Sequence, residues 1–310
     1  MTRTLMTVLR RILLALPTLG CVAVILVGLT RILPGDPAQS LAGAEASPAD
    51  VQRIRELLDL DKPFLQQLAG FLSGVVQGDF GTSFQTGQPV LEQVADRLPA
   101  TILLATTALV IGVLIGTAAG LVAALRRGRW QDHAVSLGSL TGVSLPNFWL
   151  GMMLVLVFAV WLRLLPVAGS GGLQYLVLPA IALASTPLAL VARLTRAGML
   201  EVLSSEYVMA ARAKGVPEWK VIVKHALPTG YLPVLTVIGL MFGAMLGGTV
   251  IIETLFAWPG IGTLLIHSIF TRDYPTIQGV VFIFAFLVIV LNALTDILYG
   301  VLDPRVRATR

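Results

Sequence analysis

Cysteine, histidine and charge are all scarce in this chain of 310 residues. Cys21 is the only cysteine, so no internal disulfide can form. The histidines, His133, His225 and His267, lack the paired spacing of a metal site. Charged residues make up 13% of the chain and hydrophobic residues 56%, a balance far more apolar than that of an ordinary soluble domain.

Sequence motifs of catalysis are missing as well. A P-loop needs a lysine followed by Ser or Thr, and no such pair occurs at any lysine of the chain: Lys62, Lys214, Lys220 and Lys224. No GxSxG nucleophile elbow occurs either. We therefore expect no catalytic residue, no bound cofactor and no metal ion in this chain, which disfavours a membrane-bound enzyme.

Apolar runs of about 20 residues, the length that crosses a bilayer as a helix, recur along the sequence. The first run follows Arg3, Arg10 and Arg11 and resembles a signal peptide, but its length and the distant small-residue site favour an uncleaved span. The sequence predicts an all-α membrane protein with six transmembrane helices in one domain, 1–310. The spans are expected at about 12–33, 99–125, 134–162, 174–192, 231–252 and 280–301.

A long polar connection, residues 34–98, separates the first two predicted spans. Ser47 and Pro48 mark a helix start within it. Apolar residues then recur at helical spacing after Pro48 and again after Phe64, which predicts amphipathic surface helices.

Small residues and prolines punctuate the predicted spans. Glycines at every fourth position favour close helix packing, and they are Gly112, Gly116 and Gly120 in the second span and Gly239, Gly243 and Gly247 in the fifth. Pro146 and Asn147 predict a kink in the third span. Such a kink either lines a pathway or is ordinary helix curvature.

Acidic residues are rare within the spans, where they mark proton or ion routes by default. Asp296 is the clear case, and Glu253 lies at an outer edge. Asp296 follows Asn292 by one helical turn, so a polar contact between helices is as good an interpretation as a proton relay.

Lysine and arginine indicate the orientation of the chain. With the N-terminus inside, fifteen of the 22 basic residues fall on the inner side: Arg3, Arg10, Arg11, Arg126, Arg127, Arg129, Arg193, Arg196, Arg212, Lys214, Lys220, Lys224, Arg305, Arg307 and Arg310. Inner loops of membrane proteins carry this excess. The sequence thus predicts that both termini are cytoplasmic.

A charged island, residues 206–228, lies among these apolar runs and reads EYVMAARAKGVPEWKVIVKHALP. Ser204 and Ser205 suit the cap of a helix, and Glu206 suits its first turn. Gly215 suits the left-handed residue that closes such a helix.

Pro217 suits the first turn of a second helix, which is expected to end at Pro228 or just before it. The pattern predicts a helix, a glycine turn and a second helix in a cytoplasmic loop, 199–228. A DNA-binding helix-turn-helix, or an ordinary solvated loop, shares this local signal.

The spacing of the island resembles the EAA loop of ABC-importer permeases, whose pattern is Glu-Ala-Ala, three residues, Gly, nine residues, Ile, one residue, Leu-Pro. Counting back from Gly215, Ala210 and Ala211 match the two alanines, and Leu227 and Pro228 match the end.

Met209 replaces the Glu of that pattern and His225 replaces the Ile, as the peptide/nickel branch often allows. The resemblance implies that the loop docks into a cleft on an ATP-hydrolysing subunit and transmits its movement. The residues that it assigns to the coupling loop are Glu206, Ala210, Ala211, Arg212, Lys214, Gly215, Leu227 and Pro228.

Other stretches resemble the dipeptide, oligopeptide and nickel importer permeases, with which glutathione importers share the pattern. These stretches are LPGDPA at 33–38, QGDFGTS at 77–83, WPGIGTLL at 258–265, RDYP at 272–275 and LDPRVR at 302–307. The resemblance covers essentially the whole chain and implies a type I ABC importer permease fold in a bacterial inner membrane.

The resemblance also implies partners: a second, similar permease, two ATP-binding subunits that hold ATP and Mg, and an extracytoplasmic solute-binding protein. Trp258, Pro259, Gly260, Arg272 and Asp273 are expected to receive the binding protein or form the outer gate, or else to pack for stability alone. The pattern does not fix the substrate.

The competing function is an ion-coupled secondary transporter. Such a transporter needs a coupling-ion site near the middle of the membrane, commonly with internal repeats and broken helices. The sequence shows no repeat and few acids within its spans, so it favours the permease subunit of an ATP-driven importer.

Overall fold

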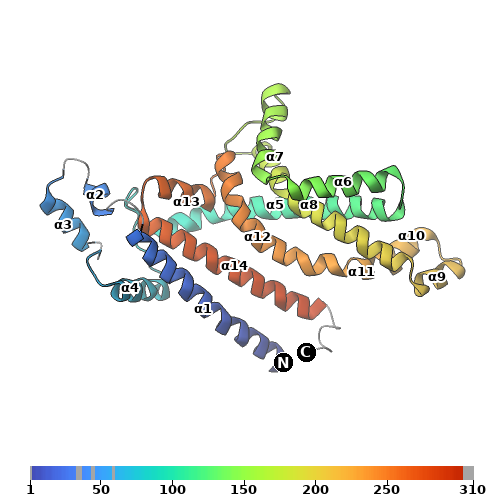
Figure 1. The fold of residues 1–310 in the computed structure, drawn as a ribbon, viewed down its shortest axis with the longest axis horizontal. Helices are drawn as coiled ribbons and strands as arrows, with labels where there is room; N and C mark the ends of the chain where they lie inside the picture. The colour runs from blue at the N-terminus through green and yellow to red at the C-terminus, as the bar shows by residue number, and fades with distance from the viewer. Residues whose placement is uncertain (1, 33–36, 43–45, 58–59, 303–310) are drawn as a thin grey trace. The chain divides into compact units, whose positions relative to one another are not determined.

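A computed structural model describes residues 2–32, 37–42, 46–57 and 60–302 of the chain. Within them the fold is helical, with one isolated bridge between Thr82 and Pro89 (Figure 1). The helices are α1 Thr2–Ile32, α2 Pro37–Ala42, α3 Pro48–Leu57, α4 Phe64–Gln77, α5 Val90–Leu125, α6 Trp130–Ser144, α7 Asn147–Leu154, η1 Val155–Trp161, α8 Leu173–Leu203, α9 Glu206–Ala213, α10 Glu218–Lys220, η2 Val221–Ala226, α11 Leu227–Gly230, α12 Leu232–Leu255, α13 Ile261–Phe270 and α14 Tyr274–Leu302, where η marks a π-helical turn. The predicted all-α class is confirmed.

The contacts within the chain group it into two compact units, where the sequence predicts one domain. The first unit combines Met1–Ala100 with Pro259–Ala293, and the second combines Thr101–Trp258 with Leu294–Arg310. Helices α5 and α14 each contribute residues to both units.

Length and composition identify four helices that can cross a membrane: α5, α8, α12 and the Tyr274–Thr295 part of α14. Helix α6 and the α7–η1 segment pass the same test as a bent pair. Helix α1 contains a shorter apolar stretch, Leu13–Leu29. These helices match the six predicted spans in order, while the number that crosses the bilayer stays a prediction.

Several helices are longer than the spans that the sequence predicts. The second span was expected to begin at Pro99, but α5 begins at Val90 and contains that proline. Val90 and Val94 are buried against Ile261, Leu264 and Val280, so packing keeps this first part of α5 helical. Residues 90–98, which the sequence assigns to the connection between the first two spans, therefore belong to a helix.

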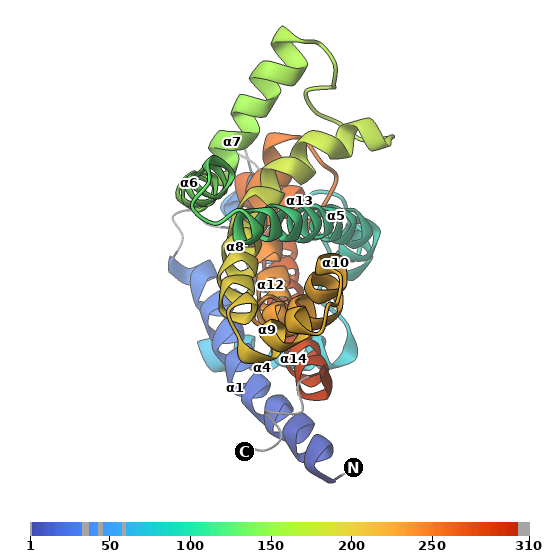
Figure 2. The ribbon, with the colours of Figure 1, turned by 90° about the vertical axis from the view of Figure 1, so that its right-hand side faces the viewer.

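The third predicted span is broken rather than kinked. The axes of α6 and α7–η1 differ by 107° (Figures 1 and 2). Leu145, the residue before Pro146, has φ −82° and ψ 130°, the extended conformation that a following proline imposes. Ordinary helix curvature is therefore the wrong interpretation of this site.

The glycine repeat of α5 faces α8, and the two helices lie side by side in the second unit (Figures 1 and 2). A Cβ atom at Gly116 would lie 2.7 Å from the carbonyl oxygen of Leu188, and one at Gly120 would meet the carbonyl oxygen of Ala192. The predicted close packing is confirmed here. In α12 the repeat is not one packed stripe, because Gly239 faces Thr295 while a Cβ at Gly247 would meet nothing within 4 Å.

The connection between α1 and α5 contains α2, α3 and α4. Ser47 precedes α3, and its hydroxyl oxygen accepts a hydrogen bond from the Asp50 backbone N–H at 3.2 Å, which confirms the predicted cap. Phe71 of α4 packs edge-on against Phe282 of α14, next to Ala23 and Leu26 of α1. The predicted apolar face of α4 thus builds the core of the first unit.

Candidate functional site

The charged island forms α9, a turn, and the run of short helices from α10 to α11, and α8 leads directly into it. Ser205 immediately precedes α9, but its hydroxyl donates to the Val202 carbonyl at 2.6 Å, so the predicted side-chain cap is wrong. The serine hydroxyl instead satisfies a carbonyl at the end of α8. Glu206 lies in the first turn of α9, as expected, and is exposed.

Gly215 closes α9 in the left-handed conformation, with φ +75°. The Val216 N–H donates to the Ala211 carbonyl at 3.2 Å, and the Gly215 N–H donates to the Arg212 carbonyl at 2.9 Å. This pair of bonds defines a Schellman motif, which satisfies carbonyls at a helix end. The predicted glycine turn is confirmed.

The second helix of the island differs from its prediction at both ends. Pro217 lies just before α10, where its carbonyl accepts the Val221 N–H at 3.1 Å, rather than in the first turn. Pro228 does not end the helix, because α11 includes it and α12 follows after Tyr231. The π-helical turn η2 precedes Pro228, and the wider i to i+5 spacing accommodates a residue that lacks an N–H.

Arg212 and Glu218 join the two helices across the glycine turn. Arg212 Nε donates to Glu218 Oε2 at 3.1 Å, and Nη2 donates to Oε1 at 2.6 Å. These hydrogen bonds lower the pKa of Glu218 and raise that of Arg212. Arg212 Nη1 also donates to the Leu203 carbonyl at 3.5 Å. The side chain thus ties the end of α8, α9 and α10 together.

The inner face of the island is apolar and anchored. Val208, Val221 and Ala226 are fully buried against Met199 and Val202 of α8. Among the motif residues, Ala211 and Leu227 are half-buried and pack on this cluster, while Ala210, Lys214 and Pro228 are exposed. The motif therefore has one face toward α8 and one toward solvent.

The solvent-exposed surface of the island carries large apolar side chains. Tyr207, Met209, Trp219 and Val223 are 45%, 53%, 60% and 51% exposed. The Lys220 ammonium lies 5.5 Å from the centre of the Trp219 ring, within cation–π range. Sequence reasoning noted Met209 only as a departure from the motif. The sequence signal for this exposed apolar surface is that the island contains more apolar residues than its buried positions can hold.

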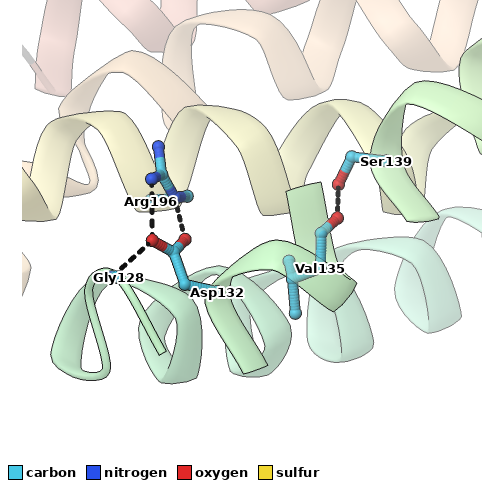
Figure 3. A network of polar contacts seen from close by, with 5 residues as sticks. All are labelled: Gly128, Asp132, Val135, Ser139 and Arg196. Carbon is cyan, nitrogen blue, oxygen red and sulfur yellow. Dashed lines mark hydrogen bonds and ion pairs between the residues drawn. The ribbon is translucent and has the colours of Figure 1, made fainter. Parts of the chain in front are cut away.

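A second ion pair fixes the start of α6 to α8 (Figure 3). Arg196 donates through Nε and Nη2 to both carboxylate oxygens of Asp132, with 3.0 Å from Nη2 to Oδ2, and the Gly128 N–H donates to the same oxygen. These contacts hold the Asp132 carboxylate of α6 against α8. The sequence offered no signal for this pair, because its members are 64 residues apart.

Asp273 is buried in the first unit and organises the QGDFGTS segment. Its carboxylate accepts hydrogen bonds from the Ser83 hydroxyl at 2.6 Å, the Phe84 N–H at 3.1 Å and the Thr276 hydroxyl at 2.7 Å. The RDYP and QGDFGTS stretches, both singled out in the sequence, thus lie together. Asp273 acts there as a positioning residue rather than an exposed contact.

The other residues predicted for the outer gate or the binding-protein contact differ in their exposure. Arg272 is exposed and has φ +56°, an uncommon backbone conformation for a non-glycine residue. Pro259 is exposed, and Gly260 is buried just before α13. Trp258 belongs to the second unit, where it is 6% exposed and its backbone N–H donates to the Glu253 carbonyl at 2.8 Å.

Of the two acidic residues predicted within or at the edge of the spans, the structure describes the side chain of Glu253 only. Glu253 is fully buried and accepts the Thr101 hydroxyl at 2.7 Å. The side chains of Asp296 and of the LDPRVR stretch lie outside the described residues. Over the part of the chain that is described, no cluster of His, Cys, Asp and Glu could hold a metal ion.

Residues 116–308 match the family model of the binding-protein-dependent transport system inner membrane component, and residues 4–105 match the model of its N-terminal part. The glutathione transport system permease protein GsiC of Escherichia coli (strain K12) is 41% identical over 300 residues, 97% of this chain and 98% of that protein. GsiC of Shigella dysenteriae serotype 1 is equally similar.

Two solved transporters share the fold. The MetNI methionine ABC transporter in an inward-facing conformation gives a TM-score of 0.57 at 16% identity, covering 68% of this chain and 96% of that one. An amino acid ABC transporter with histidines gives 0.55 at 18% identity, with 67% and 94% covered. The likeness confirms the predicted type I importer permease fold.

Proposed function

The chain belongs to the family of inner-membrane components of binding-protein-dependent transport systems, and we propose that it conducts di- or oligopeptides, or the tripeptide glutathione, into the cell. The chain is a multi-pass permease subunit of an ABC importer. ATP is hydrolysed, in this proposal, by partner subunits that hold ATP and Mg. The family membership disfavours the ion-coupled secondary transporter.

The observation that carries the coupling part of this proposal is the two-faced island of residues 206–228. Its buried face packs on α8, and its solvent-exposed face carries Tyr207, Met209, Trp219 and Val223. Exposed aromatic and methionine side chains are enriched at protein interfaces. We assign this face, with the motif residues around Gly215, to docking of an ATPase subunit.

Movement of a docked ATPase would pass into two long helices. Only Ser204 and Ser205 separate α9 from α8, and only Tyr231 separates α11 from α12. The Asp132–Arg196 pair links α6 to α8, and the glycine face of α5 packs on α8, so in this proposal the three helices move together. A ligand shifts such an equilibrium only by binding its two states differently, so ATP and solute must each favour one arrangement of these helices.

The proposed assembly contains a second homologous permease, two ATP-binding subunits and an extracytoplasmic solute-binding protein. Both termini and the island are cytoplasmic in this arrangement, and residues 34–98 face outward, as the distribution of basic residues predicts. In this proposal, Trp258 of the second unit serves the outer gate or the binding-protein contact, and so do Pro259, Gly260 and Arg272 of the first unit. Asp273 holds the QGDFGTS segment within the first unit.

Transport by the reconstituted complex tests the function. Proteoliposomes that contain both permeases and the ATPases are supplied with the binding protein and with labelled glutathione, a dipeptide or an oligopeptide. We expect uptake of at least one of them that requires ATP and persists when ionophores abolish ion gradients. Uptake driven by an ion gradient without ATP would contradict the proposal.

A further inference from the structure

We infer that Asn147, with Ser185 and Thr186, forms a contact site for the peptide bonds of the transported solute. This inference rests on the peptide class of the proposed function. The three side chains meet in the second unit, at the break between α6 and α7. There Asn147, at the start of α7, contacts the middle of α8. We call them the Asn147 corner.

Hydrogen bonds fix the geometry of the Asn147 corner. The hydroxyls of Ser185 and Thr186 both donate to Asn147 Oδ1, at 3.0 and 2.9 Å. Asn147 is the first residue of α7, beside the extended Leu145–Pro146 link. Thr186 is exposed, and Asn147 and Ser185 are half-buried, so the corner is open on one side.

Thr186 differs from the other hydroxyl-bearing residues nearby. Thr141 and Ser144 of α6 donate to the carbonyl four residues earlier, which is how a hydroxyl is usually satisfied in an apolar helix. In the part of the chain that the structure describes, Thr186 bonds only to Asn147, and Ser185 divides itself between Asn147 and the Ala182 carbonyl. The corner is therefore a polar cluster between helices.

The Asn147 corner has hydrogen-bonding capacity left over. A side-chain amide can make about four hydrogen bonds, and the two hydroxyls occupy two of these positions whichever way the amide is turned. Pro187 also lacks the N–H that would bond the Leu183 carbonyl. Unmet polar groups are costly in a bilayer, so a polar neighbour is favoured at this corner.

A peptide bond matches that capacity. It offers one donor and one acceptor, which is the chemistry of the Asn147 amide itself. The three side chains of the corner carry no charge, so they do not select for or against a charged solute side chain. A site of this kind suits solutes that share a backbone but differ in side chains.

Protection of a thiol tests the inference in the complete importer. Thr186→Cys is placed on a Cys21→Ser background, and Thr141→Cys, another exposed hydroxyl position on α6, is the matched control. The rate of reaction with a water-soluble thiol reagent is measured during turnover, with and without dialanine or S-methylglutathione. We expect an imported peptide to slow labelling at position 186 at least threefold and to leave position 141 unchanged.

Two results would overturn the inference. One is an unchanged rate at position 186 with a peptide that the wild-type importer transports. The other is a thiol that reacts in the isolated permease but never in the complete importer, which would show that the second permease covers the corner. If the wild type transports neither peptide, the proposed function fails first, and the peptide-contact assignment falls with it.

Isosteric variants give a second readout. Thr186→Val and Asn147→Leu remove hydrogen-bonding groups at nearly constant volume. Because a net hydrogen bond changes an equilibrium about fivefold, we expect peptide uptake to fall about fivefold in each, with assembly of the ATPases unchanged. Uptake at the wild-type rate in both variants would contradict the assignment.

Discussion

Arg212 reaches across the glycine turn to Glu218 with two hydrogen bonds, 2.6 Å from Nη2 to Oε1 and 3.1 Å from Nε to Oε2. Both side chains are exposed, at 40% and 54%, and such pairs contribute only about 0–1 kcal/mol to folding. The pair therefore links α9 to α10 across the glycine turn but contributes little to the stability of the protein.

The first prediction follows from this pair. Glu218→Arg alone should reduce co-purification of the ATPases, and Arg212→Glu combined with Glu218→Arg should restore it, because the swap rebuilds the contact within the loop. Glu201→Gln, an exposed change of charge on α8, is the control. If Arg212 instead binds the ATPase directly, the swapped protein will stay defective.

The second prediction concerns Asp132 and Arg196. Removing the carboxylate leaves a partly buried guanidinium without its partner, which typically costs about 1–3 kcal/mol. Asp132→Asn should therefore lower the melting temperature of the detergent-solubilised permease and weaken coupled uptake. Arg193→Gln, an exposed arginine one turn earlier, should change neither. Equal melting temperatures for both variants would contradict a stabilising role of the Asp132–Arg196 pair.

The third prediction separates Asp273 from Arg272. Asp273→Ala leaves the donors of Ser83, Phe84 and Thr276 without their shared acceptor, at a cost of about 1–3 kcal/mol. We expect it to lower the melting temperature more than Arg272→Ala does, because Arg272 is exposed, whereas Arg272→Ala should weaken binding-protein-dependent uptake. Normal uptake by Arg272→Ala would favour a purely structural role for this loop.

The fourth prediction concerns orientation. On a Cys21→Ser background, a cysteine at the exposed position Gln85 should react with an impermeant thiol reagent in intact cells. A cysteine at Glu218, which is also exposed in the structure, should react only after the membrane is opened. Labelling of the Glu218 site in intact cells would contradict the cytoplasmic placement of the island.

Local signals explain which features could be predicted from the sequence. Gly215 was identifiable because a left-handed helix end needs glycine and its neighbours define a helix by pattern alone. Pro99 and Pro228 were wrongly predicted to lie at helix boundaries. Packing keeps Pro99 inside α5, and a π-helical turn keeps Pro228 inside a helix. The pairs Asp132–Arg196 and Ser83–Asp273 join residues far apart in sequence, so only the fold reveals them.

The most direct test of the coupling assignment is Gly215→Val. A Cβ there would meet nothing within 4 Å, so the change acts only through the backbone, where φ +75° costs a β-branched residue roughly 1–2 kcal/mol. Gly78→Val is the matched control, because Gly78 also ends a helix at φ +75° with open space around it, in the connection between α1 and α5.

Co-purification of the ATPases with tagged permease, together with substrate-stimulated ATP hydrolysis in proteoliposomes, is the measurement. We predict that Gly215→Val inserts normally but loses ATPase binding or the link between hydrolysis and uptake, while Gly78→Val keeps the ATPases bound. Wild-type binding and coupled uptake in Gly215→Val would show that the island is not the coupling element.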